Sequence, residues 1–483
     1  MSSSAEALAV RHGPNYRWWV LVAVMVGTMA SIMSSTIVNV AVPDMSDAFT
    51  LGQERAQWMS AGFMAAMTVS MLVTPWLLDR FGLRGTYVGV TLLLMLGGIG
   101  GGLGRSYEWV LAMRVAEGLA AGIMQPIPAI VVMRIFGPHE QGKAMGVFGM
   151  GSVLAPAIGP SIGGVLVEHF GWRSIFFVVV PFCVVALLLA RRYLPSRAAP
   201  HEDALPARLD VWSLGLIAMA IVALLNGMVE LREAEAGVPL LAIVLLAAAA
   251  AGIVAFVLLQ RRAAQPLMAP ALFGYRAFAM GGCVAFIYGM ALFGSTYLVP
   301  VFMQTALRLP PSQAGAVLFP AGIALAITIP WGGRLADRVP VHRLVTLGIL
   351  LLAASFALML TVSLGTALAV IALWAVVGRV GLGFVLPSLN LGAVRAVEPA
   401  LIAQGASVIN FLRQLGGAVG VSLTGIVLEW RLQAHGAGLG SGSTAGQLAA
   451  FHEAFAMLAL VTAVAAAAAW RMRAAPGAGK ARS

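Results

Sequence analysis

The sequence predicts an all-α polytopic membrane protein with fourteen transmembrane helices, arranged as two six-helix bundles plus two extra central helices. Composition, the spacing of apolar runs and an internal repeat support this fold class. Of 483 residues, 60% are hydrophobic and only 10% are charged, and the mean hydropathy is +0.92. Soluble domains carry roughly a quarter charged residues. The composition therefore excludes an ordinary soluble protein.

The apolar runs have the length that a membrane requires. A hydrocarbon core of about 30 Å is crossed by roughly 20 residues of helix. The first run lacks a small-residue cleavage site, so it is expected to be a retained span that ends before Pro43. The fourteen predicted spans lie at 18–41, 57–78, 86–104, 110–132, 144–167, 175–194, 212–230, 238–259, 277–299, 313–332, 344–363, 366–389, 405–428 and 453–470.

The placement of the basic residues supports this topology. With the N-terminus inside, the cytoplasmic segments hold 21 of the 30 Lys and Arg residues, the outer segments hold six, and Arg114, Arg379 and Arg413 fall within spans. The positive-inside rule predicts this asymmetry when both termini are cytoplasmic. Because the net charge of +11 is spread over short loops, we expect no nucleic-acid partner.

The chain also repeats itself. WLLDRFGLR (76–84) follows the second span and GRLADRVPVHR (333–343) follows the tenth, which places Asp79 and Asp337 258 residues apart; Glu140 and Glu398 have the same separation. Parallel six-span repeats are a transporter architecture. The predicted domains are an N-terminal six-helix half at 1–197, two inserted helices at 198–262 and a C-terminal six-helix half at 263–483.

Five further stretches lie in or beside predicted spans: STIVNVAVP (35–43), RVAEGLAAG (114–122), APAIGPSIGG (155–164), GWRSIFFVVVP (171–181) and RQLGGAVG (413–420). With the repeated Asp-Arg loops, they make the chain resemble the major facilitator superfamily, in its fourteen-span drug:proton antiporter branch of bacterial multidrug efflux pumps. The resemblance implies a proton-coupled secondary exporter of small hydrophobic or amphipathic compounds that works by alternating access. It also implies a bacterial inner-membrane location, a monomeric transport unit, and no cofactor beyond the proton gradient.

The sequence is also compatible with other transport functions. A dedicated exporter of one endogenous metabolite and a proton symporter both fit the same architecture. A membrane receptor is disfavoured because the chain carries no soluble signalling domain, and an enzyme because it has no Walker sequence, metal cluster or nucleophile–His–acid set. In a Gram-negative host, the Gly- and Ser-rich segment 429–452, expected outside and flexible, could meet a periplasmic adaptor.

Proton coupling requires a group that exchanges a proton inside the membrane, and Glu117 is the acid that lies several residues into a span. Arg114 shares its helix face at three residues' distance. We expect the pair to carry coupling, the alternative being a structural ion pair. The resembled family usually has Gln at the position of Glu117 and an acid at the position of Ser34, which suggests that the acid has moved.

Two motifs are assigned by the resemblance. The loop residues form a conformational clasp that stabilises the outward-open state, although their arginines could simply anchor the topology; Pro75 and Pro340 depart from the usual pattern. A glycine-rich antiporter motif distinguishes exporters, the alternative being a tightly packed helix crossing. The clasp comprises Asp79, Arg80, Arg84, Asp337 and Arg338, and the antiporter motif comprises Gly159, Pro160, Gly163 and Gly164.

The expected substrate path is apolar and aromatic, because flexible Met and aromatic faces suit loosely specified ligands. For any single residue, ordinary packing is the alternative. Ser34 and Thr36 could instead tie helices together. Since Glu117 is the one acid available to meet a cationic drug, the expected substrates are neutral, zwitterionic or anionic amphiphiles, or at most monovalent cations. The candidate cavity residues are Ser35, Asn39, Trp58, Phe63, Met67, Gln125, Tyr288, Phe293, Tyr297, Asn410 and Arg413.

Overall fold

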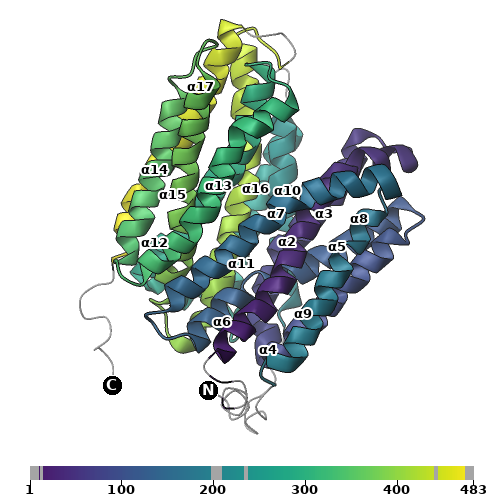
Figure 1. Cartoon of the computed structure of the whole chain (residues 1–483), viewed down its shortest axis with the longest axis vertical. Coiled ribbons are helices and arrows are strands. Elements are labelled where there is room, and N and C mark those ends of the chain that lie inside the picture. The colour runs from purple at the N-terminus through teal and green to yellow at the C-terminus, as the bar shows by residue number, and fades with distance from the viewer. Residues whose placement is uncertain are drawn as a thin grey trace. The chain divides into compact units, whose positions relative to one another are not determined.

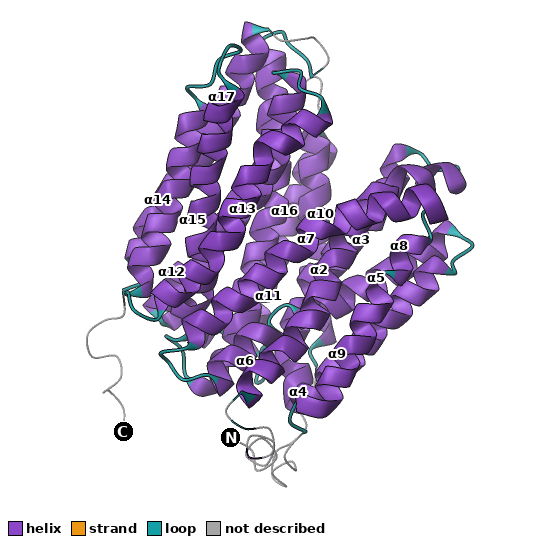
Figure 2. Ribbon diagram, viewed as in Figure 1, coloured by secondary structure: helices purple, strands orange, loops and turns teal. Residues whose placement is uncertain are grey.

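The computed structural model of the chain describes Val10, Gly13 and residues 15–196, 209–232, 238–439 and 444–473. Within these residues every regular element is a helix, as Figure 2 shows. The α-helices are α2 (Tyr16–Ala48), α3 (Gln53–Ser70), α4 (Thr74–Gly102), α5 (Tyr107–Met124), α6 (Ile127–Ile135), α7 (Gln141–Phe170), α8 (Ser174–Phe177), α9 (Val179–Tyr193), α10 (Val211–Arg232), α11 (Leu240–Arg262), α12 (Arg276–Thr305), α13 (Pro311–Ala336), α14 (Val341–Met359), α15 (Leu368–Val394), α16 (Ile402–Ala434) and α17 (Ala445–Trp470). Short 3₁₀ helices occur at Met71–Val73, Pro270–Gly274 and Pro399–Leu401.

Thirteen helical stretches of the described chain are long and apolar enough to cross a membrane. One of them, Arg55–Gly102, has 48 residues. At 1.5 Å per residue it would measure about 70 Å, more than twice a bilayer core. The helix breaks at Gly82, whose φ of 69° lies in the region that favours glycine. This stretch therefore contains two of the predicted spans, 57–78 and 86–104, and the all-α membrane fold is confirmed.

The chain divides into two compact units. Unit 1 comprises Met1–Ala218, Gln260–Ala269 and Ala400–Phe411. In its core, α2 packs along α7 and α9, and α5 packs along α3 and α4 (Figure 1). The close approach of α5 to α3 depends on two glycines, because a Cβ on Gly118 or Gly122 would collide with the backbone carbonyls of Phe63 or Met67. This packing determines where the polar side chains of α5 lie.

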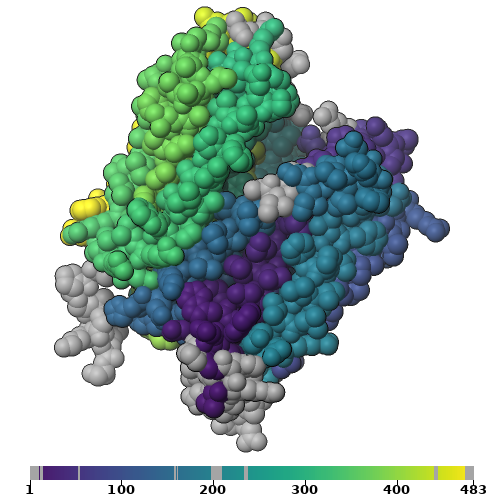
Figure 3. Space-filling view, viewed as in Figure 1, coloured from purple at the N-terminus to yellow at the C-terminus, as the bar shows by residue number. Residues whose placement is uncertain are grey.

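Unit 2 comprises Met219–Leu259, Pro270–Pro399 and Leu412–Ser483. Here α15 packs between α13 and α14, while α17 packs on α12 and α14. In the space-filling view the side chains of α13 and of α14–α15, in two shades of green, lie directly against one another (Figure 3). Helix α15 is therefore in contact with both α13 and α14.

Two local expectations were wrong. Helix α2 does not end before Pro43 but continues through it to Ala48, so this proline costs one backbone hydrogen bond without ending the helix. The segment 429–452 is not an extended loop either, since α16 runs to Ala434 and α17 begins at Ala445. Residues 440–443 lie outside the described chain.

Candidate functional site

The sequence of α5 explains why its charged pair lies inside the protein. The helix begins after Ser106, whose side chain caps the amide of Trp109, and Glu108 supplies a negative charge in the first turn. Arg114 and Glu117 follow two turns later on one helix face. Both lie on the stripe that α5 buries, and their side chains are 0% and 1% exposed. All of their described partners belong to unit 1.

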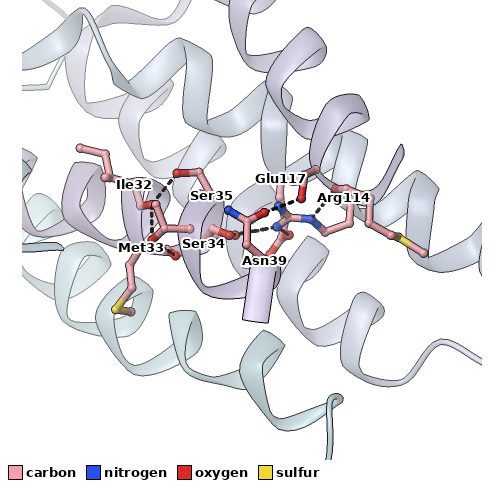
Figure 4. Close-up of polar contacts among 10 residues, drawn as sticks. Ile32, Met33, Ser34, Ser35, Asn39, Arg114 and Glu117 are labelled. Carbon is pink, nitrogen blue, oxygen red and sulfur yellow. Dashed lines mark hydrogen bonds and ion pairs between the residues drawn. The ribbon is translucent and has the colours of Figure 1, made fainter. Parts of the chain in front are cut away.

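Arg114 joins three helices through its guanidinium group. Its Nε donates to the carbonyl of Met59 on α3 at 3.2 Å, and its Nη1 donates to the hydroxyl of Ser34 on α2 at 2.9 Å. The same Nη1 lies 3.3 Å from the Ser34 carbonyl. The guanidinium carbon is 4.3 Å from the centre of the Phe63 ring, a cation–π contact. Figure 4 shows the guanidinium between Ser34 and Glu117.

Glu117 lies against the glycine-rich face of α4. A Cβ on Gly97 would come within 2.6 Å of its Cγ, and one on Gly98 within 3.4 Å of its Oε1. The carboxylate Oε2 accepts a hydrogen bond from Arg114 Nη1 at 2.7 Å. Oε1 of Glu117 and Nη2 of Arg114 are buried and have no hydrogen-bond partner among the described residues. The two glycines thus provide the room that the carboxylate occupies.

The buried pair of Arg114 and Glu117 is able to bind a proton. A buried ion pair is costly to desolvate, and removing one partner typically destabilises a protein by about 3–5 kcal/mol. An unpaired oxygen on a buried carboxylate is also a position where a proton can bind and remove the charge. Ser34 stands where the resembled family has an acid, and its hydroxyl contacts the same guanidinium that holds Glu117.

The other polar residues of α2 have different partners. Ser35 donates to the carbonyl of Ile32 at 2.6 Å, and Thr36 bonds to carbonyls of its own helix at 3.2–3.4 Å. Asn39 is exposed and accepts a hydrogen bond from the Ser60 hydroxyl at 2.7 Å. Ser34 and Asn39 therefore connect α2 to neighbouring helices, whereas Ser35 and Thr36 bond within it.

The clasp residues differ between the two units. In unit 1, Asp79 and Arg80 are exposed, and Arg84 is half-buried. In unit 2, Asp337 is 8% exposed and pairs at 3.4 Å with Arg395, which is 27% exposed. Burial lowers the pKa of Arg395, and the nearby Asp337 raises it.

Sequence reasoning missed Arg395 as the partner of Asp337. The available signal was its place three residues before the repeated Glu398, just after a predicted span. Arg338, which is predicted to belong to the clasp, is exposed.

A second contact follows the internal repeat. Arg17 forms an ion pair with Glu140, and 258 residues later the hydroxyl of Tyr275 donates to Glu398 at 2.9 Å. The hydrogen bond to Glu398 raises the pKa of Tyr275. The same two positions thus connect each first helix to the loop after its fourth span, by an ion pair in unit 1 and by a phenol–carboxylate bond in unit 2.

The glycines of the antiporter motif lie on α7 and have unequal roles in packing. A Cβ on Gly159 would lie 2.8 Å from the hydroxyl oxygen of Thr36, and one on Gly163 would lie 2.7 Å from Cγ1 of Ile37. A Cβ on Gly164 would meet nothing within 4 Å. The first two glycines let α7 approach α2, and Gly164 does not. The side chain of Pro160 lies outside the described part of the structure.

The candidate cavity residues fall into three groups. Phe63, Met67, Tyr288 and Asn410 are buried within a unit; the Tyr288 hydroxyl donates to Leu382 at 3.4 Å and the Asn410 amide donates to Ala406 at 2.9 Å. Phe293 packs on Gly417. The half-buried members are Ser35, Gln125, Phe293, Tyr297 and Arg413, and the exposed ones are Asn39 and Trp58. Their role in a substrate path stays a prediction.

The sequence model described as Major Facilitator Superfamily matches residues 24–421. The chain is 30% identical over 417 residues to the multidrug resistance protein B homolog of Mycobacterium tuberculosis (strain ATCC 25618 / H37Rv), covering 83% of this chain and 75% of that protein. It is 26% identical over 415 residues to the multidrug transporter protein MdtP of Bacillus subtilis (strain 168), covering 86% and 76%. It is 24% identical over 406 residues to the lincomycin resistance protein LmrB of Listeria monocytogenes serovar 1/2a (strain ATCC BAA-679 / EGD-e), covering 84% and 85%.

Two solved structures share the fold. The human organic anion transporter MFSD10 superposes with a TM-score of 0.64 at 17% identity, covering 95% of this chain and all of that one. The proton:xylose symporter XylE superposes with a TM-score of 0.66 at 13% identity, covering 94% and 95%. At these identities the likeness concerns the fold alone.

Proposed function

The chain belongs to the Major Facilitator Superfamily, and from this we propose that it is a proton-coupled antiporter that exports small hydrophobic or amphipathic compounds by alternating access. Multidrug transporters among its relatives support the export of several compounds. The lincomycin resistance protein LmrB supports a role in drug resistance. The location that fits this role is a bacterial cytoplasmic membrane.

The observation that carries the proton-coupled part is the buried pair of Arg114 and Glu117. Ion pairs at membrane depth are costly and commonly belong to proton relays. Here one carboxylate oxygen holds the guanidinium at 2.7 Å and the other has no described partner, so a proton can bind without displacing Arg114. Protonation removes the negative charge, which weakens the interaction between Glu117 and Arg114.

The neighbours of Arg114 determine the consequence. When Glu117 is neutral, the guanidinium still has Ser34 and the Met59 carbonyl as partners on α2 and α3. Arg114 therefore binds more strongly to these two helices, relative to the Glu117 side chain, than it does when Glu117 is charged. We propose that this exchange of partners couples the protonation state to the packing of α2, α3 and α5, and through it to the two states of the transport cycle.

The test is substrate-triggered proton movement in liposomes. Purified protein is reconstituted with a pH-sensitive dye in the lumen, an acid-inside gradient is imposed, and a panel of lipophilic dyes is added outside. Wild-type protein is expected to dissipate the gradient when a transported dye is present, whereas Glu117→Gln is expected to lose this response. Gln keeps the shape and an acceptor oxygen but cannot carry the proton.

The matched control is Glu453→Gln, since Glu453 pairs with Arg431 at 2.8 Å in a partly exposed position. This variant is expected to couple like the wild type. If Glu117→Gln couples equally well while remaining folded by circular dichroism, the pair is structural and the proton is carried elsewhere. Inward co-movement of dye and protons under an acid-outside gradient would instead identify a symporter.

A further inference from the structure

Unit 2 contains a pocket that the proposed coupling mechanism does not use. It lies among α12, α13, α14 and α15, has a volume of about 90 Å³, and is lined mainly by apolar side chains with three hydroxyl groups and one guanidinium. It is smaller than the cavity of about 150 Å³ that encloses benzene. The pocket can therefore take the carboxylate end of a ligand, but not a whole aromatic molecule.

The guanidinium belongs to Arg379, eleven residues into the 27-residue helix α15 and therefore near the middle of this apolar helix. Among the described residues, none accepts a hydrogen bond or forms an ion pair with it. The guanidinium of Arg379 interacts electrostatically with Tyr288, which also interacts with Arg413. An ionisable residue inside a transmembrane helix is a candidate functional site, and such a residue normally has a partner or faces a water-filled cavity.

The internal repeat shows what occupies the corresponding volume in unit 1. At the offset of 258 residues defined by Asp79 and Asp337, the pocket residue Ala375 corresponds to Glu117, and Ser355 corresponds to Gly97. In unit 1, the Glu117 side chain fills the space beside Gly97 and pairs with Arg114. In unit 2, the acid is replaced by the methyl group of Ala375, and the equivalent region is an open pocket beside an arginine.

We propose that this pocket is a subsite for the carboxylate of a small apolar monoanion, which supplies to Arg379 the negative charge that Glu117 supplies in unit 1. A single guanidinium with apolar walls matches one carboxylate on a hydrophobic body. The inference rests on the proposed export function and names a substrate class for it: aromatic or short aliphatic carboxylates, with the anionic end held at Arg379.

The test compares benzoate with its neutral isostere benzamide. Binding to purified protein is measured by calorimetry in a non-ionic detergent, without a proton gradient. The wild type is expected to bind benzoate at least about tenfold more tightly than benzamide, because charge-assisted hydrogen bonds are stronger than neutral ones. Arg379→Gln is expected to lose this preference, whereas Arg343→Gln, which removes an exposed charge from the start of α14, is expected to keep it.

A second variant tests the repeat argument in a folded protein. Ala375→Glu places a carboxylate four residues before Arg379 on the same helix face. It gives Arg379 an internal carboxylate, as Arg114 has in unit 1 although in the opposite order and at a spacing of three, and it fills the pocket, so benzoate binding is expected to disappear while the thermal midpoint is kept or raised. Benzoate binding within twofold of wild type in either Arg379→Gln or Ala375→Glu, or equal affinities for benzoate and benzamide, would overturn the proposal.

Two further readouts separate this inference from the proposed function. Benzoate is expected to slow the efflux of a transported dye in wild-type liposomes but not in Arg379→Gln. If benzoate binds at Arg379 without slowing efflux, the anion belongs to a resident lipid or metabolite, and the assignment to substrate is wrong. If benzoate binding depends on Arg379 but no coupled efflux is measured, only the export function is contradicted. If efflux is measured but benzoate does not bind at Arg379, only the subsite is contradicted.

Discussion

The hydroxyl group of Ser34 occupies the position where the resembled family has an acid, and it contacts the guanidinium that Glu117 also holds. Arg114 therefore lies between a position on α2 and a position on α5, either of which can bear a carboxylate. The family pattern places the acid on α2, and this chain places it on α5. Because both positions face the same cation, an exchange of the acid between them is physically reasonable.

This exchange gives a residue-scale prediction. The double variant Ser34→Asp/Glu117→Gln moves the acid from α5 to α2 while keeping one negative charge beside Arg114. We expect it to recover the substrate-triggered proton movement that Glu117→Gln alone loses, measured in the same liposomes. Thr36→Asp/Glu117→Gln is the control, since Thr36 bonds to its own helix and does not contact Arg114. Equal recovery by both double variants would show that position does not matter.

At the scale of the helix, glycines determine how closely neighbouring segments approach. Gly118 and Gly122 allow the backbone of α3 to lie close to α5, and Gly97 allows the Glu117 side chain to lie close to α4. In α7, Gly159 and Gly163 face α2, which carries Ser34. The antiporter motif therefore contacts α2, whose Ser34 accepts a hydrogen bond from Arg114, and this connects a packing feature to the proposed coupling pair.

The motif offers a matched pair of substitutions. Gly163→Ala would place a methyl group 2.7 Å from Ile37 Cγ1, so α7 and α2 must separate, and we expect a destabilisation of about 1–3 kcal/mol. Gly164→Ala meets nothing within 4 Å and is expected to leave the thermal midpoint unchanged. Thermal unfolding in detergent and dye efflux would be measured on both. An efflux defect in Gly164→Ala with normal stability would show a role for this glycine beyond packing.

At the scale of the whole molecule, the two halves keep the same positions but use different chemistry. The ion pair of Arg17 and Glu140 becomes a phenol–carboxylate bond between Tyr275 and Glu398. The position of the internal acid Glu117 is occupied by Ala375 in the second repeat, and the position of Gly137 is occupied by Arg395. The ion pairs thus lie at different places in the two repeats: Glu117 pairs with Arg114 inside unit 1, and Asp337 pairs with Arg395 after the end of α15 in unit 2.

The clasp of unit 2 can be tested in the complete transport cycle. Arg395→Gln removes the cation that pairs with Asp337 at 3.4 Å, and we expect a several-fold lower dye efflux rate because one conformational state is less favoured. Arg334→Gln removes an exposed charge from the last turn of α13 and should leave the rate near wild type. Unchanged efflux in Arg395→Gln would show that this ion pair does not favour one conformational state and that its charges only set the topology.

The sequence by itself determined the membrane class, the spans and the repeat, because run length, hydropathy and the offset between Asp79 and Asp337 are properties measured along the chain. It also singled out Glu117 and Arg114, since their spacing places them on one helix face. Their shared burial, the contact of Ser34 with Arg114 and the pairing of Asp337 with Arg395 depend on distances between helices. Those distances follow from how side chains and glycines pack, so only the tertiary structure decided them, together with the open volume beside Arg379 where unit 1 has a carboxylate.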